Sequence, residues 1–466
     1  MDEVEWKQAQ RFESFVETRP FSLKESTQPT AVLVLTDEKG IYIGFINEQP
    51  WDTRYRRKQE RDDLWTDSDR NFLSIDFDGK ANIGYFFGVS LGGSMSDGSI
   101  SGESQMDRDW DGDWEVKVSE SQTHWYSEFF LPWTVVPMMA DNQSSRNIGV
   151  YFARQMMKVG KVIGFPGINY ERKNFLSRFH PITVNQYEST KFVAFPYAVS
   201  SYDNLQDSTE YQAGLDLFWS LGSGRELNMT VNPDFGQVES DEVVINFSPV
   251  ETRLSDKRPF FAENQGLFKV SSGHNYSLID TRRIGRSPDY NCNEYSAVNG
   301  GSDDLQDSCE NQQKANNDID MALKFTQLGE NTDVGFFAAF EDDETFSAGR
   351  DFYAVRALKK LNQHKLGYLA THVERDALDR SATVHAFDYE NKATETLTIN
   401  SLLMYSDTTD ESGYGMRFGM SYDPNKFWIT GMAYYRFDDD LNINDMGYLA
   451  RNNLSKFRTF TSYTQT

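Results

Sequence analysis

The feature that most constrains this chain is an alternation of apolar and polar residues that recurs along its second half. It begins near Lys191 and is clearest at Tyr211–Leu221, Leu227–Val231, Ile319–Phe325 and Tyr414–Tyr422. A two-residue period places successive side chains on opposite faces of a β-strand, so each segment is predicted to be a strand with one apolar and one polar face. Sandwich proteins alternate in the same way, so connection lengths have to distinguish the possible architectures.

The predicted connections are alternately short and long. Short turns are expected at Gly222–Gly224, Leu328–Asn331, Leu361–His364, Glu390–Ala393 and Asp423–Lys426. Longer polar links are expected at Arg286–Asn317, Glu341–Asp351, Glu374–Arg380, Ser406–Ser412 and Asp438–Asn453. Outer-membrane barrels combine short periplasmic turns with long extracellular loops, and an aromatic fraction of 14% suits their aromatic girdles. We therefore predict an antiparallel transmembrane β-barrel of about 14 strands, counting Val243–Phe247 as one.

Residues 1–190 follow a different pattern, which is typical of a β-sandwich. Ala31–Leu35 and Ile41–Phe45 flank the turn Asp37–Gly40 and predict a hairpin. Clusters of Gly, Asp and Ser separate further predicted strands at Phe72–Phe77, Ala81–Val89, Trp114–Val118, Trp125–Leu131 and Ile148–Arg154. The predicted all-β fold is thus a sandwich at 1–190 and a barrel at 191–466, with an internal segment at 235–275 and a long loop at 286–317.

Charge and hydropathy exclude two classes of protein. With 46 basic and 71 acidic residues the net charge is −25, which argues against nucleic acid as a partner. No run of about 20 apolar residues occurs, so membrane-spanning helices are not expected. Met1–Glu3 does not start a signal peptide, and Ser462–Thr466 lacks the terminal aromatic residue common in outer-membrane proteins. These ends predict a removed leader and a barrel truncated at its C-terminus.

Strand parity predicts how the chain is oriented in an outer membrane. The link Tyr202–Glu210 precedes a short turn and is therefore expected outside the cell, which places residues 1–190 in the periplasm. The loop that carries Cys292 and Cys309 is then extracellular. The spacing of these two cysteines suits one loop-closing disulfide in an oxidising compartment, and two free thiols are the alternative.

Three segments carry a family resemblance. Asn232–Glu239 (NPDFGQVE), Lys257–Asn264 (KRPFFAEN) and Arg282–Arg286 (RRIGR) resemble the signature of a bacterial outer-membrane family of unknown function. Its members have an N-terminal domain similar to carbohydrate-binding module family 9, followed by a β-barrel. Further matches in the family's order are Trp6, Ile41–Gly44, Asp67–Asp78, Trp110-Asp111 and Trp114-Glu115. The resemblance implies a Gram-negative outer-membrane protein with a carbohydrate-binding-like periplasmic domain, and it implies no particular reaction.

Tryptophans beside polar residues are the candidate sugar-stacking groups of the first domain. These are Trp51, Trp65, Trp110 and Trp114. Pyranose rings stack on flat aromatic side chains, and neighbouring carboxylates accept hydrogen bonds from sugar hydroxyls. The alternative is that these tryptophans fill a sandwich core, as expected for Trp125 and Trp133, and that the domain has kept the fold and lost the sugar.

An acidic run offers a candidate metal site. Asp107, Asp109 and Asp111, followed by Gly112, imitate the start of a calcium loop. Val118 stands twelve positions along, where such a loop needs a bidentate Glu, so a solvated acidic loop is the competing interpretation. Calcium is the one cofactor the sequence offers.

The segment Val250–Phe268 mixes charges with a Phe pair in a way that is unusual for a barrel link. Its charged residues include Arg253, Asp256, Lys257, Arg258 and Glu263. Either it folds into the lumen and forms internal ion pairs there, or it is a periplasmic linker that binds the first domain. The polar residues predicted to face the lumen are Gln212, Asp216, Glu226, Asn228, Asp320, Lys324 and Arg417.

No catalytic constellation stands out. The six His residues lack metal-ligand spacing, no Gly-x-Ser-x-Gly is present, and 71 acids leave no carboxylate pair distinguished. We therefore predict a non-enzyme that binds or handles a glycan or other solute at the outer membrane, with lipid and an oligosaccharide as partners. Two alternatives stay open: a hydrolase of O-glycosyl bonds in carbohydrate catabolism, and a non-catalytic docking protein with a periplasmic protein partner.

Overall fold

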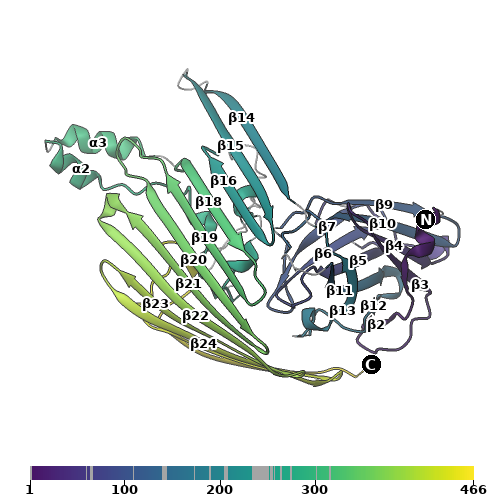
Figure 1. The fold of residues 1–466 in the computed structure, drawn as a ribbon. Helices are drawn as coiled ribbons and strands as arrows, with labels where there is room; N and C mark the ends of the chain where they lie inside the picture. Colours follow the sequence, from purple (N-terminus) through teal and green to yellow (C-terminus); the bar gives the residue numbers. More distant parts are fainter. Residues whose placement is uncertain are drawn as a thin grey trace.

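The computed structural model consists of two bodies built from β-sheets, which Figure 1 shows side by side. It describes the chain except residues 1–2, 59, 63–66, 109, 139–143, 173, 188–189, 204–207, 234–250, 252–255, 257, 263–264, 273–274, 301, 314–315 and 466. A pair of sheets near the N-terminus is followed by a twelve-stranded antiparallel sheet, so the predicted all-β fold class is confirmed. None of the helices in this described part of the chain has the length and hydropathy to cross a membrane.

The first body is a sandwich of two antiparallel sheets. The first sheet has the order β1 (Gln10–Phe12), β3 (Thr30–Thr36), β4 (Gly40–Glu48), β10 (His124–Pro132) and β9 (Glu115–Glu120). The second has the order β2 (Val16–Arg19), β12 (Lys161–Phe165), β11 (Ser145–Met156), β5 (Arg70–Asp76), β6 (Ile83–Ser90), β7 (Met95–Ser101) and β8 (Gln105–Asp107), with β13 (His180–Asn185) also paired to β11.

The predicted hairpin forms one wall of the sandwich core. Asp37 Oδ1 accepts hydrogen bonds from the backbone N–H groups of Lys39 and Gly40 and closes the turn between β3 and β4. The alternating residues of these strands, such as Val32 and Ile43, are fully buried against the second sheet. Local turn chemistry and the apolar face thus specify this part of the fold together.

The second body is a curved sheet of twelve antiparallel strands, here called the large sheet (Figure 1). Its order is β14 (Lys191–Asp203), β15 (Ser208–Gly222), β16 (Arg225–Val231), β18 (Ile319–Gln327), β19 (Thr332–Glu341), β20 (Arg350–Leu361), β21 (His364–Arg375), β22 (Arg380–Thr394), β23 (Leu397–Thr408), β24 (Ser412–Asn425), β25 (Trp428–Phe437) and β27 (Leu454–Tyr463). Short helices α1 (Pro259–Ala262), α2 (Cys292–Val298) and α3 (Asp303–Asn311) lie between β16 and β18.

The number of strands differs from the prediction of about 14. The described part of the large sheet has twelve strands, and Val243–Phe247 lies outside the described residues. Within the predicted link 438–453, β26 (Tyr448–Leu449) pairs with β17 (Tyr276–Ser277) rather than with the large sheet. A two-residue strand of this kind carries too little pattern to be assigned from sequence.

Three connections also differ from the predictions. The turn after β22 falls at 395–396 instead of Glu390–Ala393, because β22 continues through a register shift near Lys392. The links after β21 and β23 span only 376–379 and 409–411, so these two are short. Polar side chains near a strand end can point into water from either face, and hydropathy therefore does not mark where the hydrogen-bonded ladder stops.

The two faces of the large sheet have opposite character. The inner face packs against residues 256–286, and six of the seven polar residues predicted for it lie there; Asp320 is exposed beside a register shift in β18. The outer face presents a wide set of exposed apolar side chains, including Phe192, Tyr211, Trp219, Val334, Phe336, Val355, Phe387, Leu403, Tyr414, Met416, Phe418 and Phe457. The inner face therefore combines buried polar and apolar side chains under the plug, whereas the outer face exposes apolar ones.

The sandwich packs against the short-turn end of the large sheet (Figure 1). Arg172 pairs with Asp423 and donates to backbone carbonyl oxygens of the β24–β25 turn, including that of Lys426 at 2.6 Å. Lys365 Nζ donates to the carbonyl of Ala81 at 3.1 Å. These contacts join the loops of the sandwich to several successive turns, so the two bodies meet along one edge.

Replacing Arg172 with Gln is expected to loosen this junction. Arg172 is 7% exposed, and its loss leaves Asp423 and several turn carbonyls without their donor. We expect a cost of about 1–3 kcal/mol, seen as faster protease cleavage between residues 185 and 191. Arg11→Gln is the control, because the Arg11–Glu13 pair is exposed. Equal cleavage rates for both variants would contradict the assignment.

Candidate functional site

The described residues of 256–286, here called the plug segment, lie against the inner face of the large sheet. Phe260 and Phe261 are buried, with ring centroids 6.5 and 6.2 Å from that of Phe337 on β19. Lys324 Nζ donates to the carbonyl of Phe260 at 2.9 Å, and Arg356 Nε donates to the carbonyl of Leu267 at 3.2 Å. Cationic side chains of the strands thus donate hydrogen bonds to backbone carbonyl oxygens of the plug segment. The plug segment in turn covers charged groups that the inner face would otherwise leave exposed.

An internal ion pair holds the plug segment in shape. Arg258 donates to both carboxylate oxygens of Asp256, at 2.9 and 2.6 Å, and to the carbonyls of Thr281 and Ile284 at 2.7 and 2.8 Å. Burial by itself would raise the pKa of Asp256, but the hydrogen bonds and charge of Arg258 outweigh it and the pKa is lowered. The other charged residues named from the sequence, Arg253, Lys257 and Glu263, lie outside the described residues.

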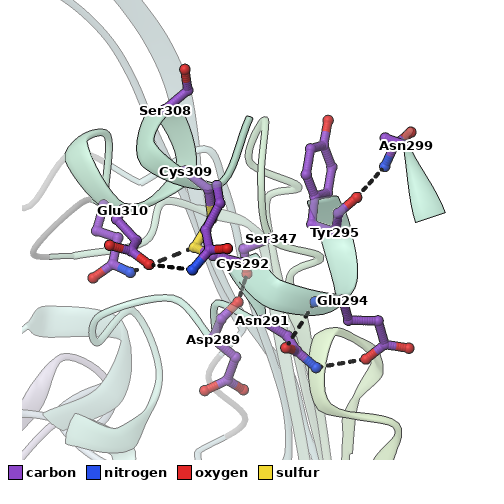
Figure 2. The surroundings of a disulfide bond; sticks show 12 residues. Asp289, Asn291, Cys292, Glu294, Tyr295, Asn299, Ser308, Cys309, Glu310 and Ser347 are labelled. Carbon is purple, nitrogen blue, oxygen red and sulfur yellow. Dashed lines mark hydrogen bonds between the residues drawn. A yellow bond between two sulfur atoms is a disulfide. The ribbon is translucent and has the colours of Figure 1, made fainter. Parts of the chain in front are cut away.

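The predicted disulfide is confirmed and closes a small helical loop. Cys292 and Cys309 are bonded, with their Cα atoms 5.6 Å apart, and they join α2 to α3. Figure 2 shows Asp289 and Ser347 beside this bond, where the Ser347 hydroxyl donates to the Asp289 carbonyl. The disulfide therefore cross-links a loop that is itself attached to the β19–β20 link.

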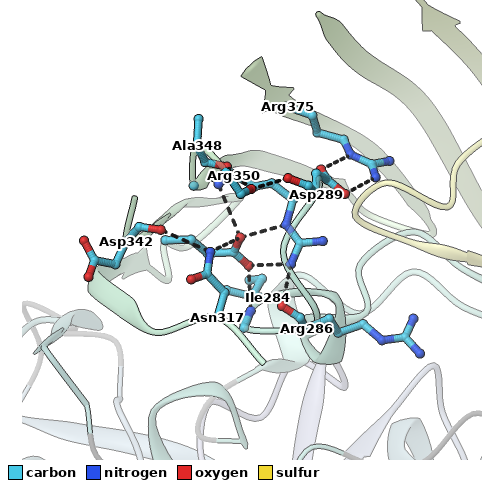
Figure 3. Close-up of polar contacts among 12 residues, drawn as sticks. Ile284, Arg286, Asp289, Asn317, Asp342, Ala348, Arg350 and Arg375 are labelled. Carbon is cyan, nitrogen blue, oxygen red and sulfur yellow. Dashed lines mark hydrogen bonds and ion pairs between the residues drawn. The ribbon is translucent and has the colours of Figure 1, made fainter. Parts of the chain in front are cut away.

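Two arginines of the large sheet anchor this loop and the plug (Figure 3). Arg350 donates to both carboxylate oxygens of Glu341, at 2.7 and 2.8 Å, and Glu341 also accepts from the backbone N–H of Gly285. Arg375 donates two hydrogen bonds, of 2.7 and 2.6 Å, to the carboxylate of Asp289. Both arginines lie at the end of the sheet opposite the sandwich, so the loop and the sandwich occupy opposite ends.

Two of the candidate sugar-stacking tryptophans are core residues. Trp110 and Trp114 are each 5% exposed. Trp110 packs on Tyr85 with ring centroids 4.7 Å apart, and Trp114 stacks on Phe129 at 5.7 Å. Neither ring offers a free face to a pyranose, because aromatic neighbours of the sandwich core already cover it.

Of the other two candidate tryptophans, only Trp51 lies among the described residues. Trp51 is 49% exposed, and the guanidinium carbons of Arg54 and Arg56 lie 5.3 and 5.0 Å from its ring centroid. A sugar stacking on Trp51 would therefore compete with two cation–π contacts. Trp65 lies outside the described residues.

The acidic run is divided between different cationic partners. Asp107 pairs with Lys269 of the plug segment, Asp111 pairs with Arg61, and Asp109 lies outside the described residues. In the part of the chain that the structure describes, no three His, Cys, Asp or Glu residues are grouped as metal ligands. The two described carboxylates act as ion-pair partners.

A cavity of about 510 Å³ lies where the sandwich meets β14 and β15. The loops 110–113 and 134–137 form one side of it, and the first strands of the large sheet form the other. Its aromatic lining includes Phe195 and Phe218, and its charged lining includes Asp111, Lys191 and Glu226. This combination of aromatic surface with a few charged groups is what carbohydrate and other small-solute sites use.

The structure brings together residues that the sequence did not connect. Trp110 was predicted to stack on sugar and Asp111 to bind calcium, whereas Phe195 and Phe218 were interpreted only as strand residues. Lys191 Nζ lies 3.1 Å from Asp113 Oδ2 and ties the first strand of the large sheet to the loop. Only the placement of the two bodies makes these residues neighbours, and no local spacing signals it.

A buried acid organises the loop behind this cavity. Asp97 accepts from the backbone N–H of Gly112 at 2.7 Å and from Trp114 Nε1 at 3.0 Å, and Arg61 pairs with it at 2.9 Å. Asp62 accepts from the Asp97 backbone N–H, and burial raises the pKa of Asp62 to about 6. The pKa of the Asp62 carboxyl group, beside this loop, is therefore well above the usual value of an aspartate.

Comparison with protein families finds a match for one part of the chain. Residues 189–347 match the model of a domain of unknown function, DUF5916. No curated protein matches the chain.

Three solved structures are distantly similar. A carbohydrate-binding candidate from Bacteroides uniformis shares 9% identity over 38% of this chain and 87% of its own, with a TM-score of 0.30. A loop-deletion mutant of OmpT, an outer membrane protein of Vibrio cholerae, shares 11% identity over 59% of this chain and 99% of its own, with a TM-score of 0.24. A porin shares 11% identity over 61% and 93%, with a TM-score of 0.26. TM-scores this low do not by themselves establish a shared fold.

Replacing Asp62 with Asn is expected to remove a pH dependence of stability. A carboxyl group whose pKa is raised on folding stabilises the protonated folded state, so its contribution falls as the pH rises from the unfolded value of 3.8 to about 6. Asn keeps the acceptor for the Asp97 N–H and suits the positive φ of this position. Thermal unfolding between pH 4 and 7 should show a smaller decline for the variant than for the wild type, and parallel curves would contradict the assignment.

Proposed function

We propose that this chain is an outer-membrane protein whose large sheet lies in lipid, whose sandwich lies in the periplasm, and which binds a glycan or other solute at the junction between them. The observation that carries the proposal is the set of exposed apolar side chains on the outer face of the large sheet, whereas the inner face, which carries both buried polar and apolar side chains, is covered by the plug segment.

The outer face supports a lipid environment on energetic grounds. A dozen large apolar side chains point outward from the strands, several of them more than half exposed, as with Phe387 and Leu403 at 58% each. Leaving such a face in water costs on the order of 10 kcal/mol or more, at about 25 cal/mol per Å² of apolar surface. Within the large sheet, each strand between the edge strands β14 and β27 pairs with a neighbour on both sides, as a bilayer requires, and closure of a barrel would pair these two edges as well.

The two ends of the large sheet support an orientation. Short turns belong to the periplasmic side of outer-membrane barrels, and the sandwich packs on the turns of this end. The opposite end carries the Cys292–Cys309 loop, and a disulfide suits the oxidising exterior of the cell. Both features support a periplasmic sandwich and an extracellular disulfide loop.

The junction cavity is the proposed place for the glycan. Its volume of about 510 Å³ suits a small oligosaccharide, and Phe218 supplies an apolar surface beside Asp111 and Glu226. Sugar rings stack on aromatic faces while their hydroxyls donate to carboxylates. This assignment moves the proposed sugar contact from the buried tryptophans to the first strands of the large sheet.

Epitope insertion tests the orientation. We expect a tag at Gly300, in the loop between α2 and α3, to be labelled on intact Gram-negative cells exporting the full chain. A tag at Lys39, in the β3–β4 turn of the sandwich, should be labelled only after the outer membrane is permeabilised. Recovery of both tagged proteins in the outer-membrane fraction is the control for targeting. Labelling in the reverse order would overturn the orientation, and recovery in a soluble fraction would overturn the membrane assignment.

Tryptophan fluorescence of the full chain in detergent tests the glycan site. Titration with cell-wall and plant-type oligosaccharides should give a saturable change that Phe218→Ala weakens about tenfold, through the loss of about 1.4 kcal/mol of stacking. Phe336→Ala on the outer face is the matched control. If no oligosaccharide produces a saturable change, or if both variants bind equally, the cavity is not a glycan site.

A further inference from the structure

A second cavity, of about 630 Å³, lies between the sandwich and the turns at the other side of the large sheet. The sandwich loop around 172–178 forms one wall, and the β22–β23 and β24–β25 turns form the other. Four cations and two carboxylates line it: Arg172, Arg178, Lys392 and Lys426, with Asp423 and Glu395. An excess of positive charge is unusual in a chain of net charge −25.

Two of these cations are occupied by the junction itself. Arg172 pairs with Asp423 and donates to three turn carbonyls. Lys392 pairs with the buried carboxylate of Glu103. These contacts hold the walls of the cavity in place and leave the remaining cations to decide its chemistry.

The remaining groups have donors to spare. Arg178 interacts electrostatically with Asp423. Among the described residues, no hydrogen bond or ion pair engages the exposed guanidinium group of Arg178. Lys426 Nζ donates to the carbonyl of Ser22 at 3.3 Å, which uses one of three ammonium hydrogens. Asn174 donates through Nδ2 to the Glu395 carbonyl, while its buried Oδ1 has no partner. The cavity therefore contains a planar donor fork and a flexible ammonium, beside an amide oxygen that can accept a hydrogen bond from a ligand hydroxyl.

We propose that this cavity binds the phosphate group of a small anionic ligand. A guanidinium offers paired N–H groups that match two phosphate oxygens, and an ammonium adds a point charge beside them. The volume is far larger than a phosphate ion needs, so the phosphate would be part of a ligand the size of a lipid headgroup or a phosphorylated sugar.

The position of the cavity defines the two sources of such a ligand. The cavity lies at the short-turn end of the large sheet, and in the orientation proposed above, on which this step rests, that end is level with the headgroups of the periplasmic leaflet. A phospholipid headgroup and a soluble phosphate ester share the same recognition chemistry there.

The test uses two substitutions: one removes a positive charge from the sandwich wall of the cavity, and the other removes a negative charge from the turn wall. Phosphate binding to the full chain in detergent is measured by calorimetry at low ionic strength, where screening is weakest. We expect Arg178→Gln to weaken binding about tenfold and Glu395→Gln to strengthen it severalfold, since one removes a donor and the other a repelling charge. Arg451→Gln, an exposed arginine at the other end of the sheet, should bind as the wild type does.

Two results would overturn the proposal: no saturable phosphate binding by the wild type, or equal affinities for Arg178→Gln and Arg451→Gln. Melting temperatures of all variants reveal any loss of folding, and Glu395→Gln provides a gain that misfolding cannot imitate. Because the titration is done in detergent without sugar, it succeeds or fails independently of the orientation and the glycan site.

Lipid retention distinguishes the sources. If mass spectrometry finds phosphatidylglycerol retained by the wild type and lost from Arg178→Gln, the ligand is a lipid headgroup. If the lipid-free chain binds inorganic phosphate or glycerol phosphate and retains no phospholipid, the ligand is a soluble ester. Either result supports the phosphate site.

Discussion

The structure depends on satisfying the polar inner face of the large sheet. Lys324 and Arg356 project from the strands toward the interior, where an unpaired cation would be costly. The plug segment supplies the carbonyl oxygens that accept from them, and its Phe pair fills the apolar space between. The alternation of the strands places the other set of side chains, which is largely apolar, on the exposed outer face.

Cationic side chains that donate to backbone carbonyl oxygens also join the sandwich to the large sheet. Arg172 and Lys365 donate across the junction to backbone oxygens that tight turns leave without partners. Contacts of this kind hold two convex bodies together at their edges and leave spaces between them. Both cavities described above lie along this junction, so the proposed binding sites belong to neither domain alone.

Much of the fold could be predicted because its signals are local. The hairpin around Asp37 combines turn residues with flanking alternation, and the structure reproduces both strands. The strand end near Lys392 was placed wrongly, because a register shift extends β22 beyond the point where the pattern fades. Trp110 and Trp114 illustrate a different limit: polar neighbours in sequence suggested exposed rings, whereas both rings are buried and pack on Tyr85 and Phe129.

The sequence by itself determined which side chains share a face of each strand, because a two-residue period leaves the backbone no other choice. It also limited any internal disulfide to Cys292 and Cys309, the two cysteines of the chain, and the structure decided between a bond and two free thiols. Only the tertiary structure decided that Asp111 and Phe218 line one cavity, and that Arg178 and Glu395 line another. Those residues lie more than a hundred positions apart, and they meet because the shapes and charges of two separately folded bodies fit at one edge.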